Sequence, residues 1–153
     1  MEKLDQIDLR ILRILQKNSK KTTKEIAKEL YLTASPVYER IRRLEKKGYI
    51  KKYVALINVK LLNKPITAIC MVSLRYHNEG FIDKFDKQIK SLKEVQECYH
   101  MAGKVDFFLK INLESLDAYH EFVRLKLSKI ENIGMLESYF VLKEIIDTTE
   151  YNI

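Results

Sequence analysis

The stretch TTKEIAKELYLTASPVYERIRRLEKKG, residues 22–48, decides the fold of the amino-terminal third of this chain. Thr22 stands three residues before Glu25, which is the capping-box spacing that begins a helix. A second helix is predicted from Thr33 to about residue 47, because Thr33 suits an N-cap and Pro36 falls in the first turn, where a missing N–H is harmless. Two short helices joined by a tight turn are typical of a helix-turn-helix.

Apolar residues recur at helical spacing around this pair. They predict one earlier helix over roughly residues 5–17, and they supply one buried stripe to each helix of the pair. The stripes comprise Leu4, Ile7, Ile11, Ile14 and Leu15; Ile26, Ala27 and Leu30; and Val37, Ile41 and Leu44. We therefore expect three helices packed around one small core.

The side of the last helix opposite its apolar stripe is polar and basic. At about 100° per residue it holds Ser35, Tyr38, Glu39, Arg42, Arg43 and Lys46. An arginine fork can bind guanine, and lysines neutralise phosphates. Arg40 lies beside the stripe instead, where it either positions the helix or touches a phosphate. A basic helix face can also be a merely solvated surface, but the capped preceding helix and tight turn favour double-stranded DNA as the partner.

Charge is divided unevenly along the 153 residues. The whole chain has 28 Lys and Arg against 21 Asp and Glu, a net charge of +7. Residues 1–64 hold 17 basic and seven acidic residues, a net +10, whereas residues 65–153 are at −3. This asymmetry predicts two domains and assigns the polyanion partner to the first of them.

The overall composition excludes several classes of protein. With 46% apolar residues, four Gly and two Pro, the chain is neither disordered nor a loop-rich sandwich. Two cysteines, Cys70 and Cys98, are too few for a secreted disulfide scaffold. No apolar run has the length of a signal sequence or a membrane span. We therefore expect a cytoplasmic protein without a membrane partner.

Beyond Pro65 the apolar period changes from helical to alternating. Strands are predicted over 66–75, 95–101, 106–112 and 135–142, with helices after the first and third strands, the second of them lined by Leu116, Tyr119, Val123, Leu127 and Ile130. This order is the ferredoxin-like βαββαβ unit. The expected fold is α+β: a winged-type helix-turn-helix domain at residues 1–50, a linker strand at 51–64, which could be a wing or a link, and the ferredoxin-like domain at 65–153.

Both helices of a ferredoxin-like unit cover the same face of its sheet, so the other face is left bare. Either assignment of the alternating residues leaves large apolar side chains there, Ile69 and Met71 or Tyr139 and Val141. A monomer would place polar residues at these positions. We therefore predict a dimer formed through the second domain.

Other chemistries find little support. Cys98 and His100 lie two apart on a predicted strand, but a metal site needs more ligands, so we interpret them as a core thiol and an ordinary histidine. No nucleophile signature, phosphate-binding glycine loop or catalytic carboxylate pair is visible, and we predict no catalytic residue, metal or cofactor. An enzyme would have only the fold in its favour. An RNA-binding module would need positive charge on the sheet domain.

Several segments resemble the Lrp/AsnC (feast/famine) transcription regulators in order along nearly the whole chain. They are LDQIDLRILRILQKNSK, EIAKELYLTASPVYERIRRLEKKGYIKKYVALIN, VQECYHMAGKVDFFLKI and SYFVLKEI. The resemblance implies an amino-terminal DNA-binding domain and a carboxy-terminal ferredoxin-like domain. It also implies dimers that assemble into tetramers or octamers.

The resemblance further implies a small effector, usually an amino acid, bound near the turn between the second and third strands. By motif, the implied effector-binding residues are Met101, Ala102, Gly103, Lys104 and Asp106, with Leu136 and Ser138 of the last strand nearby. Gly103 would let the ligand approach the backbone, and Asp106 could accept its ammonium group. Without the resemblance, the same residues would be a plain hairpin turn with a solvated aspartate.

Overall fold

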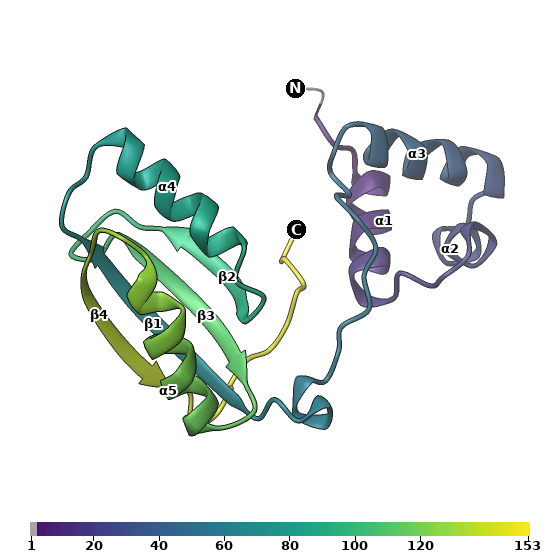
Figure 1. Cartoon of the computed structure of the whole chain (residues 1–153). Helices are drawn as coiled ribbons and strands as arrows, with labels where there is room; N and C mark the ends of the chain where they lie inside the picture. The colour runs from purple at the N-terminus through teal and green to yellow at the C-terminus, as the bar shows by residue number, and fades with distance from the viewer. Residues whose placement is uncertain (1–2) are drawn as a thin grey trace. The chain divides into compact units, whose positions relative to one another are not determined.

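The computed structural model describes residues 3–153 of the chain, which form two compact units. Residues up to Leu56, together with Ile146–Ile153, make the first unit, and Ile57–Ile145 make the second (Figure 1). Within the described residues, no helix combines the length and apolarity needed to cross a bilayer.

The first unit contains three helices: α1 (Gln6–Lys17), α2 (Thr23–Leu30) and α3 (Ala34–Lys46). Their apolar stripes meet in one core, as the helical spacing predicts. The buried core residues are Ile11, Ile26, Ala27, Leu30, Val37 and Leu44. Gly48 ends the last helix region with a φ of +77°, which only glycine adopts without strain.

The first two helices begin with a side-chain cap, and the third does not. Asp5 caps α1 and forms a reciprocal capping box with Asp8. Thr22 does the same for α2, because it accepts from the Glu25 N–H at 3.3 Å while the Glu25 carboxylate accepts from the Thr22 N–H at 2.7 Å. Thr33 precedes α3 as predicted, yet its side chain makes no capping hydrogen bond. The first-turn amides of α3 therefore lack a side-chain acceptor from their cap.

Two threonines at equivalent positions thus provide a matched pair of variants. Thr22→Ala should destabilise α2 by about 1 kcal/mol, since it removes a side-chain cap. Thr33→Ala removes no capping hydrogen bond and should cost much less. Amide hydrogen exchange of α2 and α3 in the full chain measures both effects. Equal losses in the two helices would contradict this description of the caps.

The linker strand expected at residues 51–64 is absent. Residues 51–58 have no regular secondary structure, and a short 3-10 helix, η1 (Val59–Leu62), follows them. The stretch has no neighbouring strand to pair with among residues 3–153, and its consecutive apolar residues, Tyr53 to Ile57, remain exposed. Tyr53 instead donates to the Glu45 carboxylate of α3 at 2.9 Å. Partial burial and this contact raise the pKa of Tyr53 to about 12.

The second unit is a four-stranded antiparallel sheet with two α-helices in the order βαββαβ. Its elements are β1 (Ile66–Leu74), α4 (Glu79–Lys90), β2 (Val95–His100), β3 (Phe107–Leu113), α5 (Leu116–Leu125), the short 3-10 helix η2 (Leu127–Lys129) and β4 (Ile133–Phe140). The strand order is β2-β3-β1-β4, and α4 and α5 lie on the same face of the sheet (Figure 1). The ferredoxin-like arrangement is confirmed.

Some details of this unit differ from the sequence prediction. Leu116, expected in the core, is 57% exposed at the first position of α5, whereas Phe122 is buried. The last strand begins two residues earlier than expected and ends at Phe140. Cys98 is exposed rather than a core thiol, while Cys70 is buried. The Cys98 position follows from its place on β2, an edge strand.

The last eight residues return to the first unit, which the sequence did not indicate. The side-chain amide of Gln16 on α1 donates to the Tyr151 carbonyl at 3.1 Å and accepts from the Tyr151 N–H at 2.6 Å. Arg13 donates to the carbonyl of Ile153. The chain end thus pairs with one face of α1.

Candidate functional site

The outward face of α3 presents the side chains that the sequence singles out, with one exception. Ser35, Tyr38, Glu39, Arg42 and Lys46 are all exposed. They lie at helical spacing on one side, because their positions differ by three, four and seven residues. The Arg42 guanidinium lies 5.9 Å from the centre of the Tyr38 ring, one turn back along the helix. This contact limits the freedom of an arginine that makes no ion pair within residues 3–153.

Arg43 is the exception, since its guanidinium is held by α1. Its Nη2 atom lies 2.7 Å from one oxygen of Asp8 and 2.8 Å from the other. The sequence predicts Arg43 among the DNA-binding side chains, and this stays a prediction; in the structure its side chain is 40% exposed and pairs with Asp8, which is only 2% exposed. A buried carboxylate requires such a partner, because an unpaired charge is costly away from water.

Arg40 completes the same cluster and joins α3 to the start of α1. Its Nη1 atom lies 2.6 Å from Asp5 and 2.8 Å from Asp8. The hydrogen bonds that its guanidinium donates to Asp5 and then to Asp8 raise the pKa of Arg40. The backbone N–H of Asp8 and the Arg40 guanidinium lower the pKa of Asp5. Of the two roles open to Arg40 from the sequence, the geometry favours positioning of the helix.

Two further features of this surface were not predicted. Tyr31, between α2 and α3, is 92% exposed and has a φ of +58°, which is uncommon for a residue other than glycine. The uncapped first turn of α3 follows it closely, and helix N-termini favour anions such as phosphate. The sequence held one indication that Tyr31 is exposed: an aromatic residue placed in a turn is hard to bury by packing.

The turn between β2 and β3, in the second unit, carries five of the predicted effector residues. Met101, Ala102, Gly103 and Lys104 are exposed, and Gly103 has a φ of +152° with no atom within 4 Å of the place of a Cβ. The turn is closed by the Met101 N–H, which donates to the Asp106 carbonyl at 2.7 Å. Its backbone is therefore open to a small ligand on the exposed side.

Asp106 is already engaged in holding this turn against β1. One carboxylate oxygen accepts from the Leu74 N–H at 2.7 Å and lies 3.0 Å from Nε2 of His77. The Asp106 N–H donates to the Val72 carbonyl at 2.9 Å. These contacts leave the second carboxylate oxygen as the group that could accept a ligand ammonium.

Leu136 and Ser138 lie on the other side of β1 and face the helices. Leu136 pairs with Val72 and packs against the main core. The Ser138 hydroxyl accepts from the Tyr119 hydroxyl and lies 3.8 Å from the Cys70 sulfur. Ser138 is nevertheless exposed and Leu136 is half-buried, and their role in effector binding stays a prediction. The pattern of one strand could not show which side of the sheet each would face.

The bare sheet face holds large apolar side chains that are half-buried or exposed in this chain, beside the Lys110–Glu97 ion pair. Cross-strand pairs place Ile69 beside Tyr139, and Met71 beside Phe108. Tyr99 pairs with Phe108, and their ring centres are 5.9 Å apart. Tyr139 is 54% exposed. Among the described residues, no three His, Cys, Asp or Glu side chains gather as a metal site would require.

The chain is similar in sequence to known regulators over almost its full length. Residues 4–51 match the winged helix-turn-helix DNA-binding model, and residues 67–151 match the Lrp/AsnC ligand binding domain. The leucine-responsive regulatory protein of Haemophilus influenzae is 32% identical over 145 residues, which cover 95% of this chain and 87% of the relative. The Escherichia coli K12 protein of the same name is 30% identical over 142 residues, which cover 93% of this chain and 87% of the relative.

Solved structures agree with these matches. A transcriptional regulator of Neisseria meningitidis, solved as a complex with L-Met, is 30% identical with a TM-score of 0.93, covering 98% of this chain and 97% of the other. An AsnC family regulator from Agrobacterium tumefaciens is 32% identical with a TM-score of 0.92, covering 97% of both chains. Membership of a DNA-binding regulatory family also argues against an enzyme. The chain belongs to the Lrp/AsnC family of transcription regulators, with a helix-turn-helix DNA-binding domain and a ligand-binding domain.

Proposed function

We propose that this regulator reads double-stranded DNA through the exposed side chains of α3. Ser35, Tyr38, Glu39, Arg42 and Lys46 would enter the major groove, with Arg42 as the base-reading fork. The observation that carries the proposal is that Arg42 makes no ion pair within residues 3–153, whereas the other two central arginines of α3 are anchored on α1. Arg43 then contributes by fixing the angle of α3, and Tyr31 and the first turn of α3 contact phosphates.

The proposed effector is an amino acid bound at the β2–β3 turn. Met101, Ala102, Gly103 and Lys104 supply open backbone and one cation for a carboxylate, and the remaining oxygen of Asp106 accepts an ammonium group. The complex of the Neisseria meningitidis relative with L-Met supports an amino acid as the ligand class. Binding would favour one assembly over another and so change which DNA-binding units act together. A regulator that binds chromosomal DNA works where the chromosome lies. We therefore propose a cytoplasmic location.

One titration tests both parts of this function. The affinity of the full-length protein for a genomic DNA fragment that it selects should fall steeply as the salt concentration rises. For each neutralised phosphate, a tenfold rise in salt should lower the logarithm of the association constant by roughly 0.9. The titration is then repeated with each of the twenty L-amino acids, at least one of which should change the affinity or the footprint. Salt-independent binding would contradict the DNA proposal. If none of the twenty amino acids changed the affinity or the footprint, the effector proposal alone would be contradicted.

We also propose that the bare sheet face is covered by a second copy of the chain. The patch around Ile69, Met71, Phe108 and Tyr139 is too apolar for a surface that remains in water. A two-fold dimer buries the same patch from both copies, and such dimers can assemble further into tetramers or octamers.

A charge placed in that patch should therefore separate the subunits. Ile69→Lys sets a second ammonium beside Lys110, its cross-strand neighbour, and burying both in an interface is unfavourable. We expect light scattering to give at least a dimer mass for the native chain at micromolar concentration and a monomer mass for the variant. Leu116→Lys, at an exposed position of α5 on the other layer, is the control and should keep the native mass. A monomeric native chain would refute the interface.

A further inference from the structure

A cavity of about 300 Å³ opens in the second unit, between β3 and α5 and beside the start of β1. It lies at the opposite end of β3 from the β2–β3 turn. The six residue steps of β3 from Phe107 to Leu113 span about 20 Å at the usual strand rise. The cavity is therefore a separate place from the effector site proposed at the turn. Its lining residues are Lys64, Glu94, Asn112, Leu113, Glu114, Ala118, Glu121, Phe122, Leu125 and Lys126.

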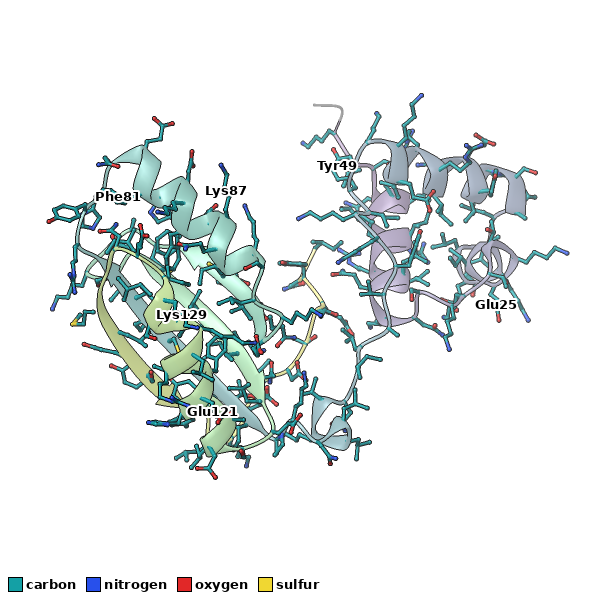
Figure 2. All side chains as sticks on the ribbon, viewed as in Figure 1. Glu25, Tyr49, Phe81, Lys87, Glu121 and Lys129 are labelled. Atoms are coloured by element: carbon teal, nitrogen blue, oxygen red, sulfur yellow. The ribbon has the colours of Figure 1, made fainter. Side chains whose placement is uncertain are left out.

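The lining combines an apolar floor with a rim of both charges. Leu113 and Phe122 are buried and form the apolar part together with Ala118 and Leu125. The rim has two cations, Lys64 and Lys126, and three carboxylates, one of which is Glu121 on α5 (Figure 2). A ligand that carries both charges and an apolar group would meet a partner for each part.

Two buried acceptors in this lining have no donor within residues 3–153. Oε1 of Glu94 accepts from Lys126, but Oε2 is buried and accepts nothing. Asn112 is 8% exposed; its Nδ2 donates to Oγ1 of Thr67 at 2.9 Å, and its Oδ1 is left without a partner. Unpaired buried acceptors are rare, and each costs roughly 1–3 kcal/mol. Both atoms can only accept, so the missing partner must carry N–H or O–H groups.

The charge state of Glu94 fits a cationic partner. Burial raises the pKa of Glu94, but the hydrogen bond from Lys126, one from the backbone N–H of Glu94 itself, and the nearby charges of Lys126 and Lys64 outweigh burial, so the pKa lies below its ordinary value. The group is thus a carboxylate at neutral pH, and its Oε2 atom has no hydrogen-bond partner within residues 3–153. An ammonium group is the donor that a carboxylate binds most strongly.

We propose that this cavity is a second small-molecule site that takes a zwitterion, an α-amino acid with an apolar side chain. Its ammonium group is held by Glu94 and Asn112, its carboxylate by Lys64, and its side chain by the surface of Phe122 and Leu125. The volume is at the small end of the range for ligand pockets, which suits a single amino acid and excludes a dinucleotide or a large cofactor. The site does not depend on whether the turn binds an effector.

Calorimetry of the full-length protein against the twenty L-amino acids tests this site. We expect at least one apolar amino acid to bind, and Glu94→Gln and Lys64→Met each to weaken it by about tenfold or more, as expected for lost charged hydrogen bonds. Lys64 is exposed, so its variant should fold even if Glu94→Gln does not. Asp117→Asn, an exposed carboxylate of α5 outside the cavity, is the matched control and should bind as the native chain does.

Three results would overturn the second site. One is that no amino acid binds, which means that water satisfies the two acceptors. Another is that Met101→Ala with Lys104→Ala removes all binding while both cavity variants bind normally, which leaves the turn as the sole site. The third is that the best ligand's amine and acid analogues, each lacking one charge, bind as tightly as the amino acid itself. DNA affinity of the same variants without amino acids should stay native, which separates this test from that of DNA binding.

Discussion

Replacing Asp8 with alanine should lower the free energy of unfolding of the first unit by about 3 kcal/mol. Asp8 is 2% exposed and pairs with both Arg40 and Arg43 of α3, and its side chain also closes the cap of α1. Removing one partner of a buried ion pair leaves the other charges without compensation. Because the second unit folds around its own core, the effect should be confined to α1–α3. Hydrogen exchange of the amides in α1 and α3 measures it in the full chain.

A second carboxylate provides the comparison for this variant. Glu29 of α2 pairs with Lys21, but its side chain is 44% exposed, so Glu29→Ala should cost between zero and about 1 kcal/mol. Asp8→Ala should also weaken DNA binding more than its effect on folding explains, since α3 loses its anchors on α1. Equal stability changes in the two variants would show that burial of Asp8 adds nothing.

The helices and strands could be predicted because their core residues repeat at a regular period. In the first unit, Ile11, Ile26 and Val37 are each buried as the helical spacing requires. In the second, β1 buries every second residue from Ala68 to Leu74. One periodic face decides an element's type and its buried side, so these features follow from local sequence.

The features that the sequence did not show depend on contacts between distant elements. Arg43 has the helical angle of an exposed residue. In the folded unit its long side chain reaches Asp8, which lies 35 residues earlier in the sequence. Residues 51–58 contain a run of consecutive apolar residues that suits a strand, but they pair with no strand of residues 3–153. The Gln16 contact with Tyr151 joins residues 135 apart. Periodicity carries no information on such pairings, because each depends on how the packed elements are arranged.

The effector residues divide in the same way. The turn at Gly103 was predicted from local sequence and is present with its positive φ. The side of β4 that faces the helices was not predicted: Leu136 packs against the core, and Ser138, although exposed, contacts Tyr119 and Cys70. The two unpaired acceptors of Glu94 and Asn112 come from separate strands and loops, and only the folded chain shows them together.

Arg42→Ala should reduce affinity for the protein's selected DNA site by roughly 5- to 150-fold. A bidentate arginine on guanine contributes about 1–3 kcal/mol of discrimination, and 1.4 kcal/mol is a factor of ten. Arg42 makes no ion pair within residues 3–153 and contacts the ring of Tyr38, so its removal leaves the fold of α3 unchanged. Arg42→Lys keeps the charge but loses the planar fork, so it should lose selectivity while keeping most of the salt dependence.

The most direct measurement is a fluorescence anisotropy titration of the full-length protein on its selected site and on a scrambled duplex of equal length. The native chain, Arg42→Ala, Arg42→Lys and the exposed control Arg124→Ala of α5 are compared at one salt concentration. Reading of DNA by α3 predicts that both Arg42 variants lose the preference for the selected site, while Arg124→Ala keeps it. An unchanged preference in both Arg42 variants would contradict DNA recognition by this helix.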